Sequence, residues 1–468
     1  MDYRKKIAEV IRSKVDMDLE TIENLIEIPP QTEMGDYAFP CFQLAKIFRR
    51  DPNIIAKELK SKLNEDGFEK VENLGGYVNF FVDKSEFIKN TLEKILLEGD
   101  NYGSSNIGEG KTICIEYSFT NIGKQFEIRD LFSELIGNSL YKLFIKEGYN
   151  VQRFDSCLGE SFYEYKITDL FNELRKSNIL SEYNGVQVVM LNKYNMPPCI
   201  ISRDDDRKVY SVIDLAAAIY RKETYDFYKC IYVTESNKSV YFKQIFRVLD
   251  LLEYSWAEDC IHARFGLFKF QDISNLNIKG ENSILEYLIN ESIDKVLKLI
   301  NESNPSLENK EEVAKKIGVG SLVFAFLKNS REKNIVFNLK DTLSFEGETA
   351  LYVQKIYSIA KEILKRFEYI DVTPNFRKLN SKEELELVKI LEGFSLAIHN
   401  ATEELEPSII TKYTIEVVYR FNEFYINHSL LNLKDKGLIM ARLELVKATC
   451  QVIKNALELI GIEVVEEI

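Results

Sequence analysis

The sequence has 468 residues, of which 45% are hydrophobic and 29% charged, a composition typical of a globular protein with several domains. The net charge of −13 argues against DNA binding, or any nucleic-acid binding through general electrostatic attraction, while a local basic face for RNA stays open. No apolar run is long enough to cross a membrane, and the N-terminus does not resemble a signal peptide. The seven scattered cysteines predict reduced thiols in a cytoplasmic protein, with no disulfide framework and no metal site.

In the N-terminal part of the chain, the residue pattern predicts two helices and a strand. Residues 1–15 carry apolar side chains at helical spacing, and Pro52 stands near the first turn of a second predicted helix. Residues 77–82 are β-branched and aromatic, which predicts a strand. The polar, Gly-rich residues 99–111 are typical of a linker, so a domain boundary is expected there.

The middle of the chain alternates between strand and helix patterns. A strand is predicted at residues 112–118 and a long helix from residue 127 to about 147, which together open an α/β unit with a parallel sheet. Further strands are predicted at residues 186–191 and 229–234 and around Phe265, and further helices at residues 160–177, 211–223 and 239–253. From about residue 284 onward, apolar residues recur at three- and four-residue spacing, which predicts a helical bundle.

Several segments, in the same order along the chain, resemble segments of a single protein family: residues 29–46, 75–82, 195–233, 344–354, 406–425 and 441–463. Together they resemble the arginyl-tRNA synthetase family. The resemblance implies a class I synthetase with an α/β multidomain fold. Its parts are an N-terminal α+β domain, a Rossmann-like catalytic-type domain with a parallel sheet, and an all-α anticodon-binding-type bundle. The implied bounds are residues 1–105 for the tRNA-elbow-type domain, 106–285 for the shortened catalytic-type domain, 286–345 for a helical stem and 346–468 for the bundle.

Enzymes of this family hold ATP with a His-Ile-Gly-His run at the start of the first long helix. The resemblance places Glu127, Ile128, Arg129 and Asp130 at these positions, so both imidazoles are replaced by carboxylates. A helix N-terminus favours negative charge, and carboxylates there satisfy it themselves and repel a triphosphate. Acids in a first turn are also ordinary helix stabilisers.

Two further family features differ in this chain. The family's mobile Lys-Met-Ser-like loop matches Ser274, Asn275, Leu276, Asn277, Ile278 and Lys279, of which Lys279 keeps a cation. The family also has an Asp-Trp-Gly element and a long insertion before its Gly-Glu-Ser-Phe-Tyr run. In this chain, residues 151–163 are continuous and contain neither the Asp-Trp-Gly element nor the insertion.

The resemblance also implies residues for the substrates. The arginine side chain is expected to be held by Glu116, Asn121, Glu160, Tyr210 and Asp214. Acids and an aromatic face suit a guanidinium, whereas Lys238 stands where the family has a glutamine for the α-amino group. The tRNA is expected to contact Tyr413, Arg420, Asn422 and Tyr425, although aromatics at this spacing are more often core residues.

The changes in the ATP motifs lead to the interpretation of a non-catalytic protein without a cofactor. We expect it to bind arginine or a related guanidino compound, a tRNA, or a protein partner, in a sensing or regulatory role. The first alternative is an active arginine–tRNA ligase, in which Lys279 and backbone amides replace the lost groups and ATP is used. The second is a different ligase or transferase on the same scaffold, working through Glu127, Arg129 and Asp130.

Overall fold

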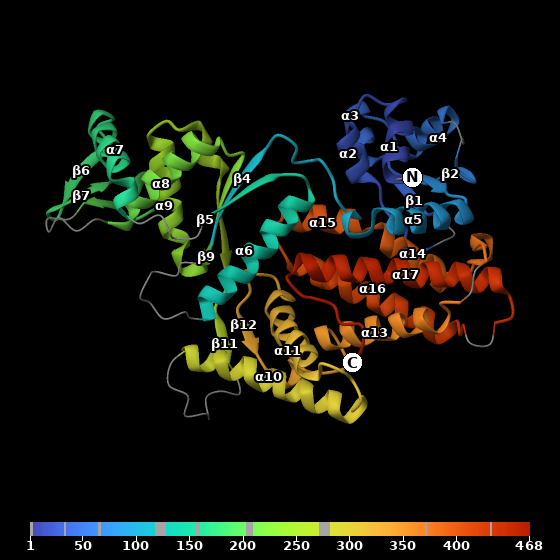
Figure 1. Cartoon of the computed structure of the whole chain (residues 1–468). Coiled ribbons are helices and arrows are strands. Elements are labelled where there is room, and N and C mark those ends of the chain that lie inside the picture. Colours follow the sequence, from blue (N-terminus) through green and yellow to red (C-terminus); the bar gives the residue numbers. More distant parts are fainter. Residues whose placement is uncertain are drawn as a thin grey trace. The chain divides into compact units, whose positions relative to one another are not determined.

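The computed structural model describes most of the chain: residues 3–31, 34–63, 67–117, 128–154, 160–202, 209–270, 281–369, 372–430 and 433–468. Two compact units are formed, each from segments that lie apart in the sequence (Figure 1). Unit 1 contains Met1–Gly99, Phe367–Glu392 and Glu423–Thr449, and unit 2 contains Asp100–Arg366, Gly393–Asn422 and Cys450–Ile468.

Unit 1 is built around a small antiparallel sheet of order β1-β3-β2. Its first segment contains α1 (Tyr3–Arg12), α2 (Leu19–Leu25), β1 (Tyr37–Pro40), α3 (Phe42–Phe48), α4 (Pro52–Lys62), β2 (Lys70–Leu74), β3 (Tyr77–Phe81) and α5 (Lys84–Glu98). The predicted N-terminal helix is α1, the helix after Pro52 is α4, and the predicted strand is β3. The strands β1 and β2 were not predicted, because β1 contains a proline and β2 buries only Val71.

Within unit 1, a buried ion pair joins α14 (Lys382–Glu392) to the first part of α17 (Lys436–Leu459), which belongs to this unit up to Thr449. Arg442 Nε donates to Glu384 Oε1 at 2.7 Å, and both residues are buried. The second oxygen of Glu384 accepts from the backbone N–H of Ser381 at 3.0 Å, so one carboxylate caps α14 and neutralises Arg442. This arrangement fixes the crossing of the two helices.

The core of unit 2 is a sheet of four parallel strands in the order β10-β9-β4-β5. These strands are β4 (Thr112–Glu116), β5 (Asn150–Phe154), β9 (Lys229–Glu235) and β10 (Cys260–Phe265). Helix α6 (Ile128–Lys146) lies on one side of the sheet, and α8 (Tyr210–Tyr225) and α9 (Ser239–Leu251) lie on the other (Figure 1). The predicted α/β fold with a parallel sheet is confirmed.

Close packing holds α6 against the sheet. The Ser133 hydroxyl donates to the carbonyl of Val233 at 2.7 Å, and the rings of Phe132 and Phe265 meet edge to face at 5.1 Å. A Cβ at Gly137 would lie 2.2 Å from the ring of Tyr117, which directly follows β4. Only glycine therefore allows this approach, which sets the path of α6 relative to β4.

A second, antiparallel sheet of order β6-β7-β8 lies between β5 and α8 in the sequence. This region contains η3 (Glu160–Tyr163), α7 (Glu164–Lys176), β6 (Leu180–Tyr183), β7 (Val186–Val189), η4 (Asn192–Tyr194) and β8 (Cys199–Ser202). The predicted helix over residues 160–177 and the strand at residues 186–191 correspond to α7 and β7. The strand β5 was not predicted, because residues 151–163 were interpreted as one continuous run.

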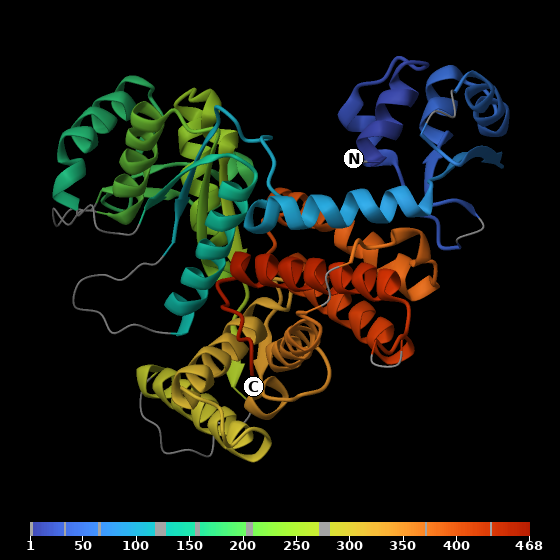
Figure 2. The same ribbon diagram turned by 45° about the vertical axis from the view of Figure 1, so that its right-hand side comes forward.

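The rest of unit 2 is mainly helical. It contains η5 (Ser236–Lys238), η6 (Ser255–Asp259), β11 (Phe268–Phe270), α10 (Glu281–Ser303), α11 (Lys310–Leu327), β12 (Ile335–Phe337), α12 (Leu339–Thr342), α13 (Ala350–Arg366), α15 (Phe394–Glu403) and most of α16 (Ser408–Asn427). Helices α10 and α11 lie side by side in both views (Figures 1 and 2). The predicted helical region is confirmed apart from β12, which is too short to show a pattern. None of the described helices has the length and apolar character needed to cross a membrane.

Candidate amino-acid site

Four side chains meet near the carboxyl ends of the parallel strands, and we call them the Asp214 cluster: Glu116, Asp214, Arg221 and Tyr241. Glu116 is the last residue of β4, Asp214 and Arg221 lie on α8, and Tyr241 lies on α9. Open α/β sheets bind ligands at the carboxyl ends of their strands. The cluster is therefore placed where such a fold offers a binding site.

Arg221 is the cation of the cluster. Its guanidinium forms an ion pair with Glu116, and the residue is 5% exposed. The guanidinium carbon lies 4.5 Å from the ring centroid of Phe154 and 5.6 Å from that of Tyr232. Burial by itself lowers the pKa of Arg221, but the opposite charge of Glu116 raises it well above its usual value. Arg221 is thus a permanently charged, internal partner for Glu116.

Asp214 is the second carboxylate of the cluster, and no cationic side chain among the described residues forms an ion pair with it. Its Oδ2 accepts a hydrogen bond from the Tyr241 hydroxyl. Burial, followed by the charge of Glu116, raises the pKa of Asp214 to about 7. The nearby charges of Arg221 and Lys238 act in the opposite direction. An incoming cation would favour the ionised form of this carboxylate.

The other expected arginine-binding residues are less well placed or lie outside the described residues. Tyr210 is the first residue of α8 and is 70% exposed. Glu160 is the first residue of η3, and its side chain lies outside the described part of the structure. Asn121 lies outside the described part of the chain. The structure therefore brings Glu116 and Asp214 together and leaves the roles of the other three as predictions.

The residues at the expected ATP motifs are described only in part. Ile128 is buried in the first turn of α6, Arg129 is exposed beside it, and Asp130 follows in the same turn. Glu127 and the loop residues lie outside the described ranges: Ser274, Asn275, Leu276, Asn277, Ile278 and Lys279. Among the described residues, no group of three or more His, Cys, Asp or Glu side chains is arranged to hold a metal ion.

The sequence analysis did not single out Arg221, although a signal was present. Arg221 follows Asp214 by seven residues, so both lie on the same face of α8, and the residues between them are mostly apolar. A charged side chain at such a position is rarely buried without a partner. The partner of Arg221 is Glu116, which the sequence alone does not identify.

The four residues expected to contact tRNA all lie on α16. The ring of Tyr413 is buried and stacks on Phe394 at 5.3 Å, so this residue packs in the core. Arg420 is partly exposed and pairs with Glu416 at 2.9 Å. Asn422 is partly exposed and Tyr425 is 41% exposed, so these side chains reach solvent.

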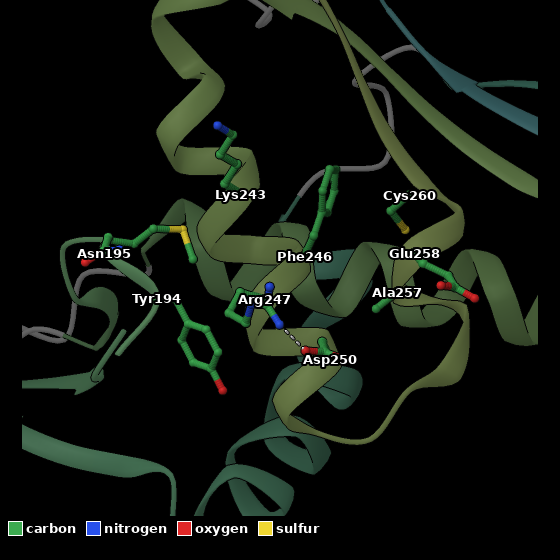
Figure 3. Close-up of a pocket in the computed structure, with 10 residues that line it drawn as sticks. Tyr194, Asn195, Lys243, Phe246, Arg247, Asp250, Ala257, Glu258 and Cys260 are labelled. Atoms are coloured by element: carbon green, nitrogen blue, oxygen red, sulfur yellow. Dashed lines mark hydrogen bonds and ion pairs between the residues drawn. The ribbon is translucent and has the colours of Figure 1, made fainter. Parts of the chain in front are cut away.

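A separate hollow of about 710 Å³ lies beside α9 (Figure 3). The loop after η4, one side of α9, η6 and Cys260 line it. The guanidinium of Arg247 lies 4.4 Å from the ring centroid of Tyr194 and pairs with Asp250 at 2.5 Å. Among the described residues that line the hollow, none belongs to the Asp214 cluster.

A parallel sheet that begins with β4 and α6, followed by a helical bundle, defines a class I aminoacyl-tRNA synthetase fold. Three family models match the chain: "tRNA synthetases class I (R), catalytic domain" over residues 91–157 and 153–339, "DALR anticodon binding domain" over residues 353–468, and "Arginyl tRNA synthetase N terminal domain" over residues 1–82. The chain belongs to the arginyl-tRNA synthetase family.

Similar proteins support this assignment over the full length. An "Arginine--tRNA ligase" of Clostridium botulinum (strain Alaska E43 / Type E3) is 48% identical, and one of Clostridium beijerinckii is 46% identical, with all of both chains covered. The solved arginyl-tRNA synthetase of Thermus thermophilus has a TM-score of 0.83 at 18% identity, covering 99% of this chain and 100% of that one. The last comparison shows the shared fold.

The comparisons also locate a deletion. The alignment with the C. botulinum protein runs over 562 positions against 468 residues in this chain, a difference of 94. The catalytic-domain model matches in two parts that meet at residues 153–157, directly after β5. This is where the sequence analysis found the family's insertion to be missing.

The interpretation as a non-catalytic sensing or regulatory protein is contradicted by these relatives. Curated proteins that match the whole chain at 44–48% identity are arginine–tRNA ligases. The interpretation depended on a few motif positions, mainly Glu127–Asp130. Phosphates are also bound by the backbone N–H groups of a helix N-terminus, which changes of side chain leave in place.

Proposed function

We propose that the chain is an arginine–tRNA ligase, which activates arginine with ATP and transfers it to tRNA. The full-length similarity to curated ligases supports this activity. The observation that carries the proposal is the position of Asp214, a carboxylate at the carboxyl edge of the parallel sheet, where a guanidinium would find a charged partner. The domain division at residues 105, 285 and 345 and a cytoplasmic location are part of the proposal.

In the first step, an oxygen of the arginine carboxylate attacks the α-phosphorus of ATP, and pyrophosphate leaves. In the second, a ribose hydroxyl at the 3′ end of the tRNA attacks the carbonyl carbon of the arginyl adenylate, and AMP leaves. Asp214 would bind the arginine side chain, and Tyr241 would hold Asp214 in place through its hydroxyl. This positioning supplies much of the catalysis in group transfer between bound substrates.

The phosphates of ATP would be held by the first turn of α6. The backbone N–H groups and the dipole at a helix N-terminus favour an anion, and Arg129 adds a cation on the exposed side of the same turn. Lys279 is expected to meet the charge that develops on pyrophosphate. The tRNA would be contacted along α16 by Arg420, Asn422 and Tyr425.

The test is ATP–pyrophosphate exchange with purified protein, with arginine present or absent and with tRNA present or absent. We expect exchange that depends on arginine, followed by the formation of arginyl-tRNA. Absence of exchange in both conditions that contain arginine, with and without tRNA, would contradict the proposal. Exchange with another amino compound in place of arginine would favour a different ligase on this scaffold.

Arginine binding is expected to depend on pH through Asp214. Its raised pKa of about 7 means that the carboxylate is mostly protonated at pH 6 and mostly ionised at pH 8, while arginine is cationic at both. The affinity for arginine should therefore rise about tenfold from pH 6 to pH 8. Isothermal titration calorimetry in phosphate and Tris at pH 7 should also show proton release on binding. An affinity that is flat over this range would contradict the assignment.

A further inference from the structure

The Asp214 cluster contains two carboxylates, which are not equally available to a ligand. Glu116 forms an ion pair with Arg221, whose guanidinium is among the most buried charged groups of the described chain. In the described part of the chain, the side chain that hydrogen-bonds to Asp214 is the neutral hydroxyl of Tyr241. A substrate guanidinium would have to displace an internal guanidinium to reach Glu116, whereas Asp214 needs only to be ionised.

The structure holds Arg221 firmly in place. The rings of Phe154 and Tyr232 lie within 4.5 Å and 5.6 Å of its guanidinium carbon, so aromatic faces and a carboxylate surround the charge. Phe154 is the last residue of β5 and directly precedes the position of the deletion. The side chain of Arg221 is 6% exposed, so its release into solvent would require opening this part of unit 2.

We propose that Arg221 is a positioning residue of the amino-acid site, which holds and neutralises Glu116 so that Asp214, and not Glu116, receives the cationic group of the substrate. This inference rests on the proposed function, because it names how the arginine site of that ligase is built. Glu116 then acts on the substrate only indirectly, through its charge on Asp214. In the competing arrangement, which follows the family resemblance, Glu116 and Asp214 both bind the guanidinium directly.

The charge balance around Asp214 gives the proposal measurable consequences. The groups that act on it come from four elements: Glu116 on β4, Arg221 on α8, Tyr241 on α9 and Lys238 on η5. Arg221 is in turn faced by Tyr163, Tyr232 and Cys230. Removal of Arg221 alone leaves the negative charge of Glu116 uncompensated beside Asp214. Asp214 should then ionise at higher pH and bind a cation less well at neutral pH.

The experiment compares wild type with Arg221→Gln, Glu116→Gln and the double variant, by calorimetric titration of arginine between pH 6 and pH 9. In Arg221→Gln, we expect the pH midpoint of binding to rise by about one unit and the affinity at pH 7 therefore to fall about fivefold. In the double variant the midpoint should return below that of Arg221→Gln, and the affinity at pH 7 should recover about fivefold. Arg247→Gln on the opposite end of α9 is the matched control and should titrate as wild type does.

Two results would overturn the inference. One is an Arg221→Gln variant that binds arginine at pH 7 as tightly as wild type or more tightly, because a freed Glu116 would then be a direct ligand. The other is a double variant no better than Arg221→Gln. If Arg221→Gln does not fold, as judged by circular dichroism, the double variant still decides: binding of arginine at pH 7 at least about tenfold weaker than in wild type would also overturn the inference, because Glu116 would then be a direct ligand. Absence of arginine binding by wild type at every pH contradicts the proposed function instead.

Discussion

The Asp214→Asn variant is expected to lower kcat/KM for arginine in ATP–pyrophosphate exchange by about 10²–10³-fold, with little change in the KM for ATP. An amide keeps the shape of the side chain and its contact with Tyr241, but it removes the negative charge that would pair with the guanidinium. Leaving one partner of a desolvated charge pair uncompensated costs about 3–5 kcal/mol, which corresponds to this range. Steady-state exchange kinetics with varied arginine measure the effect.

The matched control is Asp226→Asn at the other end of the same helix. Asp226 caps the C-terminus of α8, its side chain is 91% exposed, and its backbone φ of 42° suits asparagine as well as aspartate. This variant should keep wild-type kinetics. An Asp214→Asn variant that retains more than about a third of the wild-type kcat/KM would show that the arginine side chain binds elsewhere.

The Arg442→Met variant is expected to lower the free energy of unfolding by about 3–5 kcal/mol, because it leaves the buried carboxylate of Glu384 without its cation. Methionine fills a similar volume, so lost packing contributes little. Urea denaturation followed by circular dichroism measures the change. The double variant Glu384→Gln with Arg442→Met should recover part of the loss.

The exposed pair of Arg366 and Glu362 on α13 provides the control for this prediction. Both side chains are more than half exposed, and Arg366→Met should change stability by no more than about 0.5 kcal/mol. If Arg442→Met destabilised the protein no more than Arg366→Met does, the ion pair between α14 and α17 would not be a stabilising feature of unit 1.

The main features of the fold were predictable from the sequence because long periodic segments have clear patterns. The strand before α6, the alternating helices and the helical C-terminal part were all found from hydrophobic spacing. β11 and β12 have three residues each, β1 contains a proline and β2 buries only Val71, so these strands show no clear pattern. β5 was missed because its residues were interpreted as part of one continuous run over residues 151–163.

The candidate site was predictable only to the level of residue types. Family resemblance pointed to Glu116 and Asp214, and the structure places both near the carboxyl edge of the sheet. The pairing of Glu116 with Arg221 depends on how α8 lies against β4, which no spacing in the sequence specifies. The error about catalysis had a related cause. The interpretation relied on the side chains of one helical turn more than on the resemblance of the whole chain to the family.

Unit 1 combines residues from both ends of the chain. Asp36, for example, pairs with Lys389 at 2.8 Å across 353 positions, and the backbone N–H of Asn375 donates to the carbonyl of Gly437. During synthesis on the ribosome, the first ninety-nine residues therefore cannot form their complete unit until Glu423–Thr449 has been synthesised. Contacts of such long sequence separation slow folding, so the nascent N-terminal segment should depend on chaperones until translation is almost finished.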